Sequence, residues 1–555
     1  MIILGVNRSS HNGSVCLLKD NEVIFNLESE RLSNIKHDQY VFEAIRLIKN
    51  YVNYIDILAL AGLTKTQSYD MNREESVYAA CVLGLNKSFM DHGFKTYDLW
   101  DKHHEMHAAS SFYNSGFDEA LCIVKDGAGS DYYLSQHDER YKDFIGRESS
   151  SAFIMSYPNN IEIIEKQITI TELVKEDYVC INDNIFVTNS ISEGHAYEIA
   201  SEALGFTSFD AGKVMGMSSY GKPDTSIPKI YKNGFINKDL FSINNYKIKN
   251  KDLNFNINDT FNDKSNFAYA LQSEVQENVA NYIIEMLNKT KQNNLCLSGG
   301  LFLNCVANYH LLKKLNPNIN IYIEPMSSDA GTALGVAKYI HYELTQDMKK
   351  NPQKNIYYGP KYNYTEKDLT NEKTKKVTLQ DIAKLISEKN IVAMYQGKSE
   401  SGPRALGNRS ILYDPRDKNG KNHVNIVKQR EWFRPFAGSV LKEYAKDWFD
   451  LKFLEESKFM MFAVDVIDNK KNLIPAITHI DGTCRVQTVA EEDNVNYYNL
   501  IKEFYKITGV PILFNTSFNL AGNVIVETLD DALYTLHNSE IKYLYLPELS
   551  LLVTK

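Results

Sequence analysis

A strand, a polar turn and a second strand occur twice in the first quarter of this chain, and this recurrence constrains the fold more than any other feature. The strand-like run Ile2–Val6 leads through a serine- and glycine-containing turn into Val15–Leu18. The run Leu121–Lys125 leads in the same way through the turn 126–130 into Tyr132–Leu134. The repeat predicts an α/β fold that is duplicated within the first part of the chain.

A duplication of this kind is typical of the actin and sugar-kinase fold, in which each turn offers backbone N–H groups to a phosphate. The helical spacing of apolar residues predicts a helix over Phe267–Asn288. The next segment predicts a buried strand that ends in the loop Ser298-Gly299-Gly300, before a helix over Leu301–Leu312. A glycine loop between a strand and a helix can hold a phosphate or a ribose, although an ordinary strand-to-helix turn has the same pattern.

The length of 555 residues predicts two domains, because one hydrophobic core rarely serves so long a chain. Hydrophobic residues make up 43% and charged residues 24%, as in globular proteins. A polar, lysine- and asparagine-rich region from His341 to Lys376 contains Gly359-Pro360 and predicts the domain junction. We therefore expect one domain over residues 1–355 and a second over 356–555.

Charge and cysteine usage limit the partners and the compartment. The formal net charge of −9 gives no general attraction to polyanions, so a broad nucleic-acid surface is not expected. The 7 cysteines are scattered and never in CxxC spacing, which indicates a reduced, cytoplasmic compartment. We expect no membrane partner and no targeting segment, because no apolar run approaches the roughly 20 residues of a membrane span.

Two histidines four residues apart are the sharpest chemical signal in the first half. His103 and His107 lie in a segment that predicts a helix between Tyr97 and Phe112, so both can reach one metal ion. Their spacing departs from the zinc-protease pattern HExxH, and two solvent-facing histidines are the alternative. Asp126 at a strand end and Asp329 in a glycine-flanked loop are the acidic candidates. Such a donor set suits iron, manganese or zinc better than calcium.

A local surplus of positive charge marks the second half. The segment Gln396–Arg434 has nine basic and four acidic residues within a chain of net charge −9, which predicts an anion-binding pocket, with a solvated surface as the alternative. It is not a P-loop, because position 392 is valine where that motif needs glycine. Asn515, Ser517 and Asn519 follow the strand-like run Val510–Phe514 and offer amide and hydroxyl groups.

Several of these segments resemble the O-carbamoyltransferase family of antibiotic and nodulation-factor biosynthesis. Members of that family join a TsaD-like domain, of the duplicated actin and sugar-kinase type, to a YrdC-like α/β domain. The most distinctive segments are Gly402–Ser410 (GPRALGNRS) and Asn515–Asn519 (NTSFN). Further segments match in order along nearly the whole chain, including Ser298–Asn308 and Asp329–Gly335.

The resemblance implies a two-step reaction. The YrdC-like domain would form carbamoyl-adenylate from carbamoyl phosphate and ATP, with Mg²⁺ accompanying the ATP. The TsaD-like domain would hold a divalent metal, Fe²⁺ in the sites it resembles, and pass the carbamoyl group to a hydroxyl of a small-molecule, sugar or nucleoside acceptor. A modified base in DNA remains open as an acceptor, and a homodimer is compatible with the sequence.

The resemblance also implies roles for individual residues. The metal ligands would be His103, His107, Asp126 and Asp329, and His11 would act on the acceptor hydroxyl as a base or as a hydrogen-bonding group. The adenylate in the TsaD-like domain would lie near Lys36, Ser298, Gly299, Gly300 and Asn304. In the YrdC-like domain Arg404 and Arg434 would be catalytic, and the ligand-binding residues would be Arg409, Lys428, Arg430, Asn515, Ser517 and Asn519.

The chain departs from the family pattern in places. The usual HDAS-like turn has Asn12 in place of its aspartate, the acidic residue often found before GKxMG is Ala211, and the proline expected after RPFA is Gly438. The change at position 12 concerns acceptor recognition more than adenylate formation. Two other functions stay open at this point: a threonylcarbamoyl-type tRNA modification enzyme, and a nucleotide-binding protein without turnover.

Overall fold

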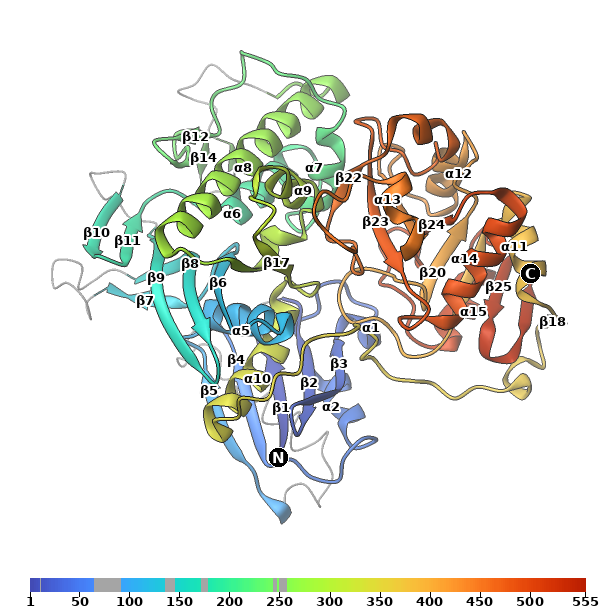
Figure 1. The fold of residues 1–555 in the computed structure, drawn as a ribbon, viewed down its shortest axis with the longest axis horizontal. Helices are drawn as coiled ribbons and strands as arrows, with labels where there is room; N and C mark the ends of the chain where they lie inside the picture. The colour runs from blue at the N-terminus through green and yellow to red at the C-terminus, as the bar shows by residue number, and fades with distance from the viewer. Residues whose placement is uncertain (10, 64–90, 135–144, 171–177, 243–246, 249–256) are drawn as a thin grey trace. The chain divides into compact units, whose positions relative to one another are not determined.

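The computed structural model describes residues 1–9, 11–63, 91–134, 145–170, 178–242, 247–248 and 257–555 (Figure 1). The chain forms two compact units. Unit 1 contains Met1–Ser29 and His37–Gln353, and unit 2 contains Glu30–Lys36 and Lys354–Lys555. The short helix α1 (Glu30–Ser33) therefore belongs to unit 2, although the residues on either side of its segment belong to unit 1.

Unit 1 uses one sheet topology twice. The strands of the first sheet are β1 (Ile2–Asn7), β2 (Ser14–Lys19), β3 (Glu22–Glu28), β4 (Ile57–Ala61) and β5 (Lys95–Leu99). The strands of the second sheet are β6 (Glu119–Lys125), β7 (Asp131–Tyr133), β8 (Ile145–Ser156), β9 (Asn160–Thr169), β10 (Tyr178–Asn182), β11 (Ile185–Thr188), β16 (Asn294–Ser298) and β17 (Asn320–Ile323). Two short antiparallel pairs stand apart: β12 (Tyr231–Lys232) with β13 (Phe235–Ile236), and β14 (Phe241–Ser242) with β15 (Lys247–Ile248). The first sheet has the order β3-β2-β1-β4-β5, and the second contains β9-β8-β6-β16-β17. β1 is antiparallel to β2 and parallel to β4, and β6 is antiparallel to β8 and parallel to β16 in the same way. The predicted duplication is confirmed.

The second copy differs from the sequence expectation in its pairing. The sequence predicts that Tyr132–Leu134 pairs with Leu121–Lys125, but β8 pairs along all of β6, and β7 pairs only with the start of β8. The predicted helix over Tyr97–Phe112 also begins later. Residues Lys95–Leu99 pair in parallel with β4, so the helix starts only at His103.

Two helices lie between the sheets of unit 1 and share one core with them. α10 (Thr332–Thr345) packs on β1 and β2, α5 (His103–Ser115) packs on β6 and β16, and the two helices pack on each other (Figure 1). A Cβ atom on Gly335 would lie 2.0 Å from the carbonyl oxygen of Met106, so only glycine allows this close approach of α10 to α5. The first turn of α10 is thereby held against the first turns of α5.

The remaining α-helices in the described part of unit 1 are α2 (Phe42–Ile48), α6 (Glu193–Ala203), α7 (Ala211–Ser218), α8 (Phe261–Thr290) and α9 (Cys305–Lys314). Of these, α6 to α9 pack together, whereas α2 packs on β2 and β3. α8 contains the helix predicted over Phe267–Asn288 and packs against α7 and α9. α9 begins at Cys305 rather than at Leu301, because the side chain of Asn304 accepts a hydrogen bond from the Ala307 N–H and caps the helix there.

Unit 2 is built on one mixed sheet of nine strands. They are β18 (Lys373–Lys376), β19 (Val392–Tyr395), β20 (Arg409–Tyr413), β21 (Ala437–Leu441), β22 (Ala463–Asp465), β23 (Thr483–Val489), β24 (Ile512–Ser517), β25 (Tyr543–Leu546) and β26 (Leu551–Thr554), in the order β18-β26-β25-β19-β20-β24-β21-β23-β22. Besides α1, its α-helices are α11 (Leu379–Ser387), α12 (Gly420–Val427), α13 (Ala445–Trp448), α14 (Val495–Thr508) and α15 (Leu529–His537). Capping boxes at Thr378 and Thr528 start α11 and α15.

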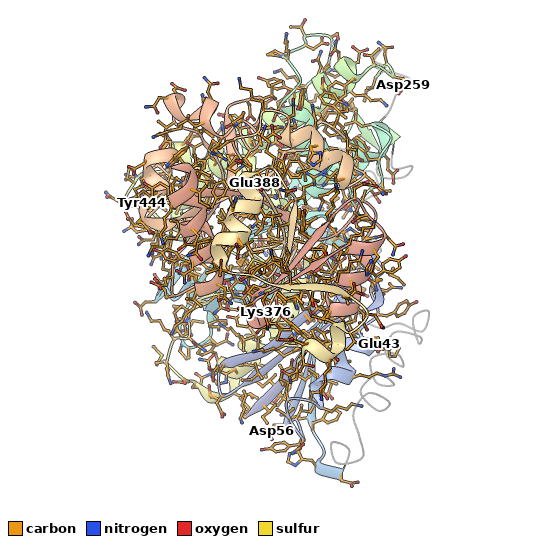
Figure 2. The ribbon with its side chains drawn as sticks, turned by 90° about the vertical axis from the view of Figure 1, so that its right-hand side faces the viewer. Glu43, Asp56, Asp259, Lys376, Glu388 and Tyr444 are labelled. Atoms are coloured by element: carbon orange, nitrogen blue, oxygen red, sulfur yellow. The ribbon has the colours of Figure 1, made fainter. Side chains whose placement is uncertain are left out.

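The surface carries charges of both signs. Glu43, Lys376 and Glu388 are exposed, and each has an oppositely charged side chain nearby on the surface (Figure 2). Such exposed pairs contribute little to stability. Over the part of the chain that the structure describes, none of the helices combines the length and the apolar composition that crossing a bilayer requires.

Candidate functional site

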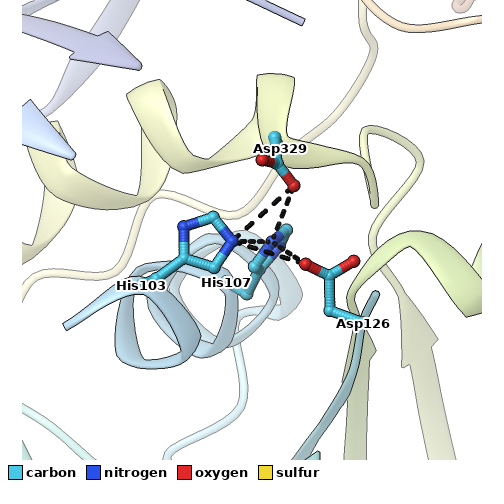
Figure 3. Close-up of side chains that lie close together, drawn as sticks. All are labelled: His103, His107, Asp126 and Asp329. Carbon is cyan, nitrogen blue, oxygen red and sulfur yellow. Dashed lines mark hydrogen bonds and ion pairs between the residues drawn. The ribbon is translucent and has the colours of Figure 1, made fainter. Parts of the chain in front are cut away.

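Two histidine side chains on α5 converge in the interior of unit 1 (Figure 3). His103 and His107 are both completely buried, and their Nε2 atoms lie 3.2 Å apart. The i, i+4 spacing places them on one face of the helix, as the sequence predicts. Their burial excludes the alternative of two solvent-facing histidines.

Two aspartates complete the group from the ends of other elements. Asp126 directly follows β6, and Asp329 lies just before α10. The Nε2 atom of His103 lies 3.4 Å from Asp126 Oδ2 and 3.6 Å from Asp329 Oδ1. All four possible ligand atoms lie within 4.8 Å of one another. We call these four residues the metal cluster.

The geometry of the metal cluster fits a coordination shell. Metal–ligand bonds of about 2.1 Å place neighbouring ligand atoms roughly 3.0–3.4 Å apart. The His107 Nε2 atom lies 3.8 Å from Asp126 Oδ2 and 3.7 Å from Asp329 Oδ1, only slightly further than that range. Two imidazoles and two carboxylates suit iron, manganese or zinc.

The electrostatics of the metal cluster favour a cation. Burial alone would lower the pKa of His103, but Asp329 and Asp126 raise it to about 10. Burial alone would raise the pKa of Asp126, but the two histidines hold it at about 2. The buried carboxylates thus require compensating positive charge, which a bound divalent metal supplies more fully than one imidazolium.

A second layer of contacts holds the metal cluster in place. Ser298 Oγ lies 3.3 Å from the Nδ1 atom of His107, and the Gly300 N–H donates to Asp126 Oδ1 at 3.0 Å. Such contacts orient metal ligands. The Ser298-Gly299-Gly300 loop therefore lies at the metal cluster. Gly299 has a φ of 99°, and a Cβ atom there would lie 2.3 Å from the carbonyl oxygen of Lys125.

A buried ion pair supports the start of α5. The His103 N–H donates to Ser130 Oγ at 3.0 Å, and the Ser130 N–H donates to Glu148 Oε2 at 3.1 Å. Lys166 Nζ donates to the other oxygen of Glu148 at 2.6 Å. Although burial opposes it, Lys166 is the main group that lowers the pKa of Glu148 to about 2. No sequence motif indicated Glu148 or Lys166, because they come from separate strands.

His11 lies beside the metal cluster. Its Nε2 atom is 3.9 Å from Asp329 Oδ2, and its Nδ1 atom is 2.8 Å from Asn12 Oδ1. Asn12 has a φ of 53° and thus holds the turn in the left-handed region that asparagine tolerates. Burial alone would lower the pKa of His11, but Asp329 raises it above its ordinary value. Asn12, which replaces the aspartate of the family pattern, thus orients His11.

Asn304 and Lys36 have surroundings that the sequence did not indicate. Besides capping α9, Asn304 donates to the Tyr197 hydroxyl at 3.1 Å and to Gln272 Oε1 at 2.9 Å. Its polar atoms thus have partners inside the protein. Lys36 belongs to unit 2, where its charge adds to the burial and to the arginines that hold the pKa of Lys428 well below its usual value.

Unit 2 gathers cationic side chains from several elements. Lys428 is 2% exposed, and its ammonium group donates to Ser517 and to Asn519 Oδ1. Burial and the neighbouring Arg434 and Arg485 hold the pKa of Arg430 well below its usual value. Burial and Arg430 lower the pKa of Lys421 to about 8. We call this group the basic cluster: Lys36, Lys421, Lys428, Arg430, Arg434 and Arg485.

The depressed pKa values in the basic cluster have two physical causes. Mutual repulsion and burial both disfavour the charged forms, and a bound polyanion would relieve both. Arg485 escaped the sequence prediction because it lies on β23, far along the chain from the basic segment. The predicted residues Ser517 and Asn519 contact Lys428 and so lie at the basic cluster.

Other predicted residues of unit 2 have structural contacts. Arg409 is fully buried, donates to the backbone carbonyls of Gln396 and Glu527, and lies over the ring of Tyr395 at 3.9 Å. Asn515 is also fully buried and donates to Ala405 O at 3.1 Å. These two side chains hold the sheet and its loops together.

The loop that contains Arg404 is shaped by a buried carboxylate. Glu400 Oε1 accepts hydrogen bonds from the backbone N–H groups of Leu406 at 2.7 Å and Asn408 at 2.8 Å. These bonds fix the turn after Arg404, whose side chain is half-buried. Arg434 lies 3.6 Å from Glu431 and remains partly exposed.

Comparison with known proteins gives matches over most of the chain. Residues 53–338 match the family described as carbamoyltransferase N-terminus, and residues 383–553 match carbamoyltransferase C-terminus. The nodulation protein NolNO of Sinorhizobium fredii is 30% identical over 96% of this chain and 78% of its own length. The nodulation protein NolO of Bradyrhizobium diazoefficiens is 32% identical over 79% of this chain and 76% of its own length. The uncharacterized protein MJ1058 of Methanocaldococcus jannaschii is 32% identical over 96% of both chains.

Proposed function

Because the chain belongs to the carbamoyltransferase family, we propose that it is an ATP-dependent O-carbamoyltransferase with two reaction steps. In unit 2, carbamoyl phosphate takes up one water and releases phosphate, and an oxygen of the resulting carbamate attacks the α-phosphorus of ATP. Pyrophosphate leaves and carbamoyl-adenylate forms. In unit 1, the hydroxyl of a small-molecule acceptor attacks the carbamoyl carbon, loses its proton, and AMP leaves.

The observation that carries this proposal is the metal cluster with His11 beside it. His11 has its Nδ1 atom held by Asn12, and its Nε2 atom is the one that faces Asp329. When neutral, Nε2 can accept the proton of the acceptor hydroxyl as that hydroxyl attacks. A divalent metal held by the four ligands would act as a Lewis acid that stabilises charge on the departing phosphate.

The basic cluster supports the activation step in unit 2. Carbamoyl phosphate and ATP together bring several negative charges, and Lys428, Arg430 and Arg434 offer compensating charge. Reactions at phosphorus depend mainly on positioning and on neutralising charge. The depressed pKa values of Lys428 and Arg430 rise again when an anion binds, which favours binding of the substrates.

The test separates the two steps. We expect the protein, incubated with carbamoyl phosphate, ATP and Mg²⁺ but no acceptor, to release pyrophosphate. Addition of hydroxylated metabolites should then give products with an added carbamoyl group by mass spectrometry. A requirement for threonine and bicarbonate would instead indicate a threonylcarbamoyl enzyme. Nucleotide binding without pyrophosphate release would indicate a protein without turnover.

A further inference from the structure

A buried arginine from early in the chain holds the loop that leads to Arg404. Arg31 on α1 is 2% exposed, and its Nη2 atom donates hydrogen bonds to Gly402 O at 2.9 Å and to Glu400 O at 3.2 Å. Arg31 and Gly402 are 371 positions apart in sequence, and both belong to unit 2. The start of this loop is therefore fixed by a side chain from outside the basic segment of the second half.

The other end of the same loop is bonded to the sheet that carries the basic cluster. Asn515 Nδ2 donates to Ala405 O at 3.1 Å, and Gln487 Nε2 donates to Leu406 O at 3.0 Å. Gln487 stands two residues after Arg485 on β23, and side chains two residues apart on a strand share one face of the sheet. The loop therefore crosses the face on which Arg485 of the basic cluster lies.

Arg31 also compensates a buried carboxylate beside the loop. Its Nη1 atom lies 3.8 Å from Oε2 of Glu527, which is 1% exposed. The other oxygen of Glu527 accepts a hydrogen bond from Ser399 Oγ at 2.8 Å. Because the guanidinium group is planar and rigid, it fixes the directions of its contacts with the carboxylate and with the two carbonyl groups. The ammonium group of a lysine cannot reproduce this arrangement.

We propose that Arg31 is a positioning residue for the activation step, which holds the loop Glu400–Leu406 so that Arg404 is directed at the phosphates of the bound substrates. The proposal rests on the two-step reaction proposed above. Arg31 is buried and acts through the backbone of the loop, not on the substrates themselves. A displacement of roughly 1 Å in a group that acts on the substrate can lower a rate about 100-fold, so the hold on this loop bears directly on the rate.

The first experiment measures pyrophosphate release by the complete protein with carbamoyl phosphate, ATP and Mg²⁺. Arg31→Lys keeps a positive charge near Glu527 but loses the planar fork, so we expect kcat to fall about 10- to 100-fold, with a smaller change in KM for both substrates. Ile382→Ala is the matched control, because it opens a cavity at a fully buried position of α11 and destabilises unit 2 without touching the loop. Below its unfolding transition this control should keep the wild-type kcat.

The second experiment is chemical rescue, which a purely structural role would not show. In Arg31→Ala, guanidinium chloride at millimolar concentration should raise pyrophosphate release severalfold, because the free ion can occupy the place of the missing group. Sodium chloride at the same ionic strength should not. Since guanidinium weakens folded proteins in general, a variant that is merely destabilised gains nothing from it. Arg46→Ala, which removes an exposed arginine, should have wild-type activity and no response.

The outcomes separate this inference from the proposed function. If Arg31→Lys keeps the kcat of Ile382→Ala, Arg31 only stabilises the fold, the positioning role is wrong and the two-step reaction stands. Arg31→Lys decides alone if the alanine variant does not fold. If the wild-type protein releases no pyrophosphate, the proposed function fails and this inference fails with it.

Discussion

At the scale of single residues, the metal cluster separates the transfer step from the activation step. We expect His103→Ala to lose bound metal, measured by elemental analysis, and to lower carbamoyl transfer about 100-fold or more while pyrophosphate release persists. Arg404→Ala should abolish pyrophosphate release. His310→Ala, which removes a histidine paired with Glu277, is the control and should change neither. Loss of pyrophosphate release in His103→Ala, with transfer from supplied adenylate intact, would reverse the assignment of the two steps.

The Glu148–Lys166 pair gives a pH-dependent stability. The pKa of Glu148 is about 2 in the folded protein and is ordinarily 4.5, so the pair stabilises the fold above about pH 4.5 and loses this effect as the pH falls toward 2. We expect Glu148→Gln to destabilise the protein by about 3 kcal/mol at pH 7. The difference from wild type should shrink between pH 5 and pH 3 in urea unfolding.

The control for this prediction is Glu162→Gln on β9, where the side chain is exposed. It should behave as the wild type at both pH values. A difference between wild type and Glu148→Gln that stays constant down to pH 3 would show that the ion pair is not the source of the effect.

Sequence spacing and resemblance identified the residues of the metal cluster, because each stands in a distinctive local pattern. Local pattern could not identify Glu148 or Arg485 as site residues, because their neighbours come from other elements of the fold. It also could not show that the polar atoms of Arg409 and Asn304 have partners inside the protein. The roles assigned to these two residues in ligand binding stay predictions.

At the scale of elements, the packing of α10 on α5 positions Asp329 opposite the two histidines. A Cβ atom at position 335 would meet the carbonyl oxygen of Met106 at 2.0 Å, so Gly335→Ala must push the helices apart. We expect a loss of about 1–3 kcal/mol of stability, with weaker metal binding in a metal titration. Unchanged metal affinity would show that the four ligands do not depend on this contact.

A glycine in α7 provides the matched control. A Cβ atom at Gly212 would meet no atom within 4 Å. Gly212→Ala should therefore be neutral or stabilise the protein by up to about 1 kcal/mol, because alanine favours a helix.

The sequence predicted the elements with strong periodicity and missed details of their pairing. The helix over Phe267–Asn288 and the duplicated sheets are confirmed. The predicted partner of β6 was wrong, because the longer strand β8, further along the chain, pairs with that edge of β6. The predicted start of α5 was also wrong, because residues 95–99 form a strand that pairs with β4, which lies far away in sequence. Both errors concern long-range pairing, which local propensity does not encode.

At the scale of the whole molecule, Arg31 ties an early segment into unit 2. Its guanidinium group donates to Gly402 O at 2.9 Å and lies 3.8 Å from Glu527 Oε2. Arg31→Met would leave the buried Glu527 without this cation, so we expect unit 2 to lose about 3 kcal/mol of stability. Arg46→Met, at an exposed ion pair, should change stability by less than about 1 kcal/mol.

Two compact units predict two thermal transitions in calorimetry. Fe²⁺ should raise the midpoint of one transition and ATP with Mg²⁺ the midpoint of the other, because a ligand stabilises the unit that binds it. Arg31→Met should lower only the transition that ATP raises. A single transition shifted equally by both ligands would contradict the assignment of the two sites to separate units.

Because the segment Glu30–Lys36 belongs to unit 2, unit 2 cannot fold completely until both parts of its chain have been synthesised. The ribosome produces this segment long before Glu527, which emerges roughly half a minute or more later at ordinary elongation speeds. During that interval Arg31 lacks its carboxylate partner, so unit 2 can be completed only after residue 527 has been made. A nascent chain halted before position 527 would therefore hold the segment in a form that proteases can cut, and the finished chain would protect it.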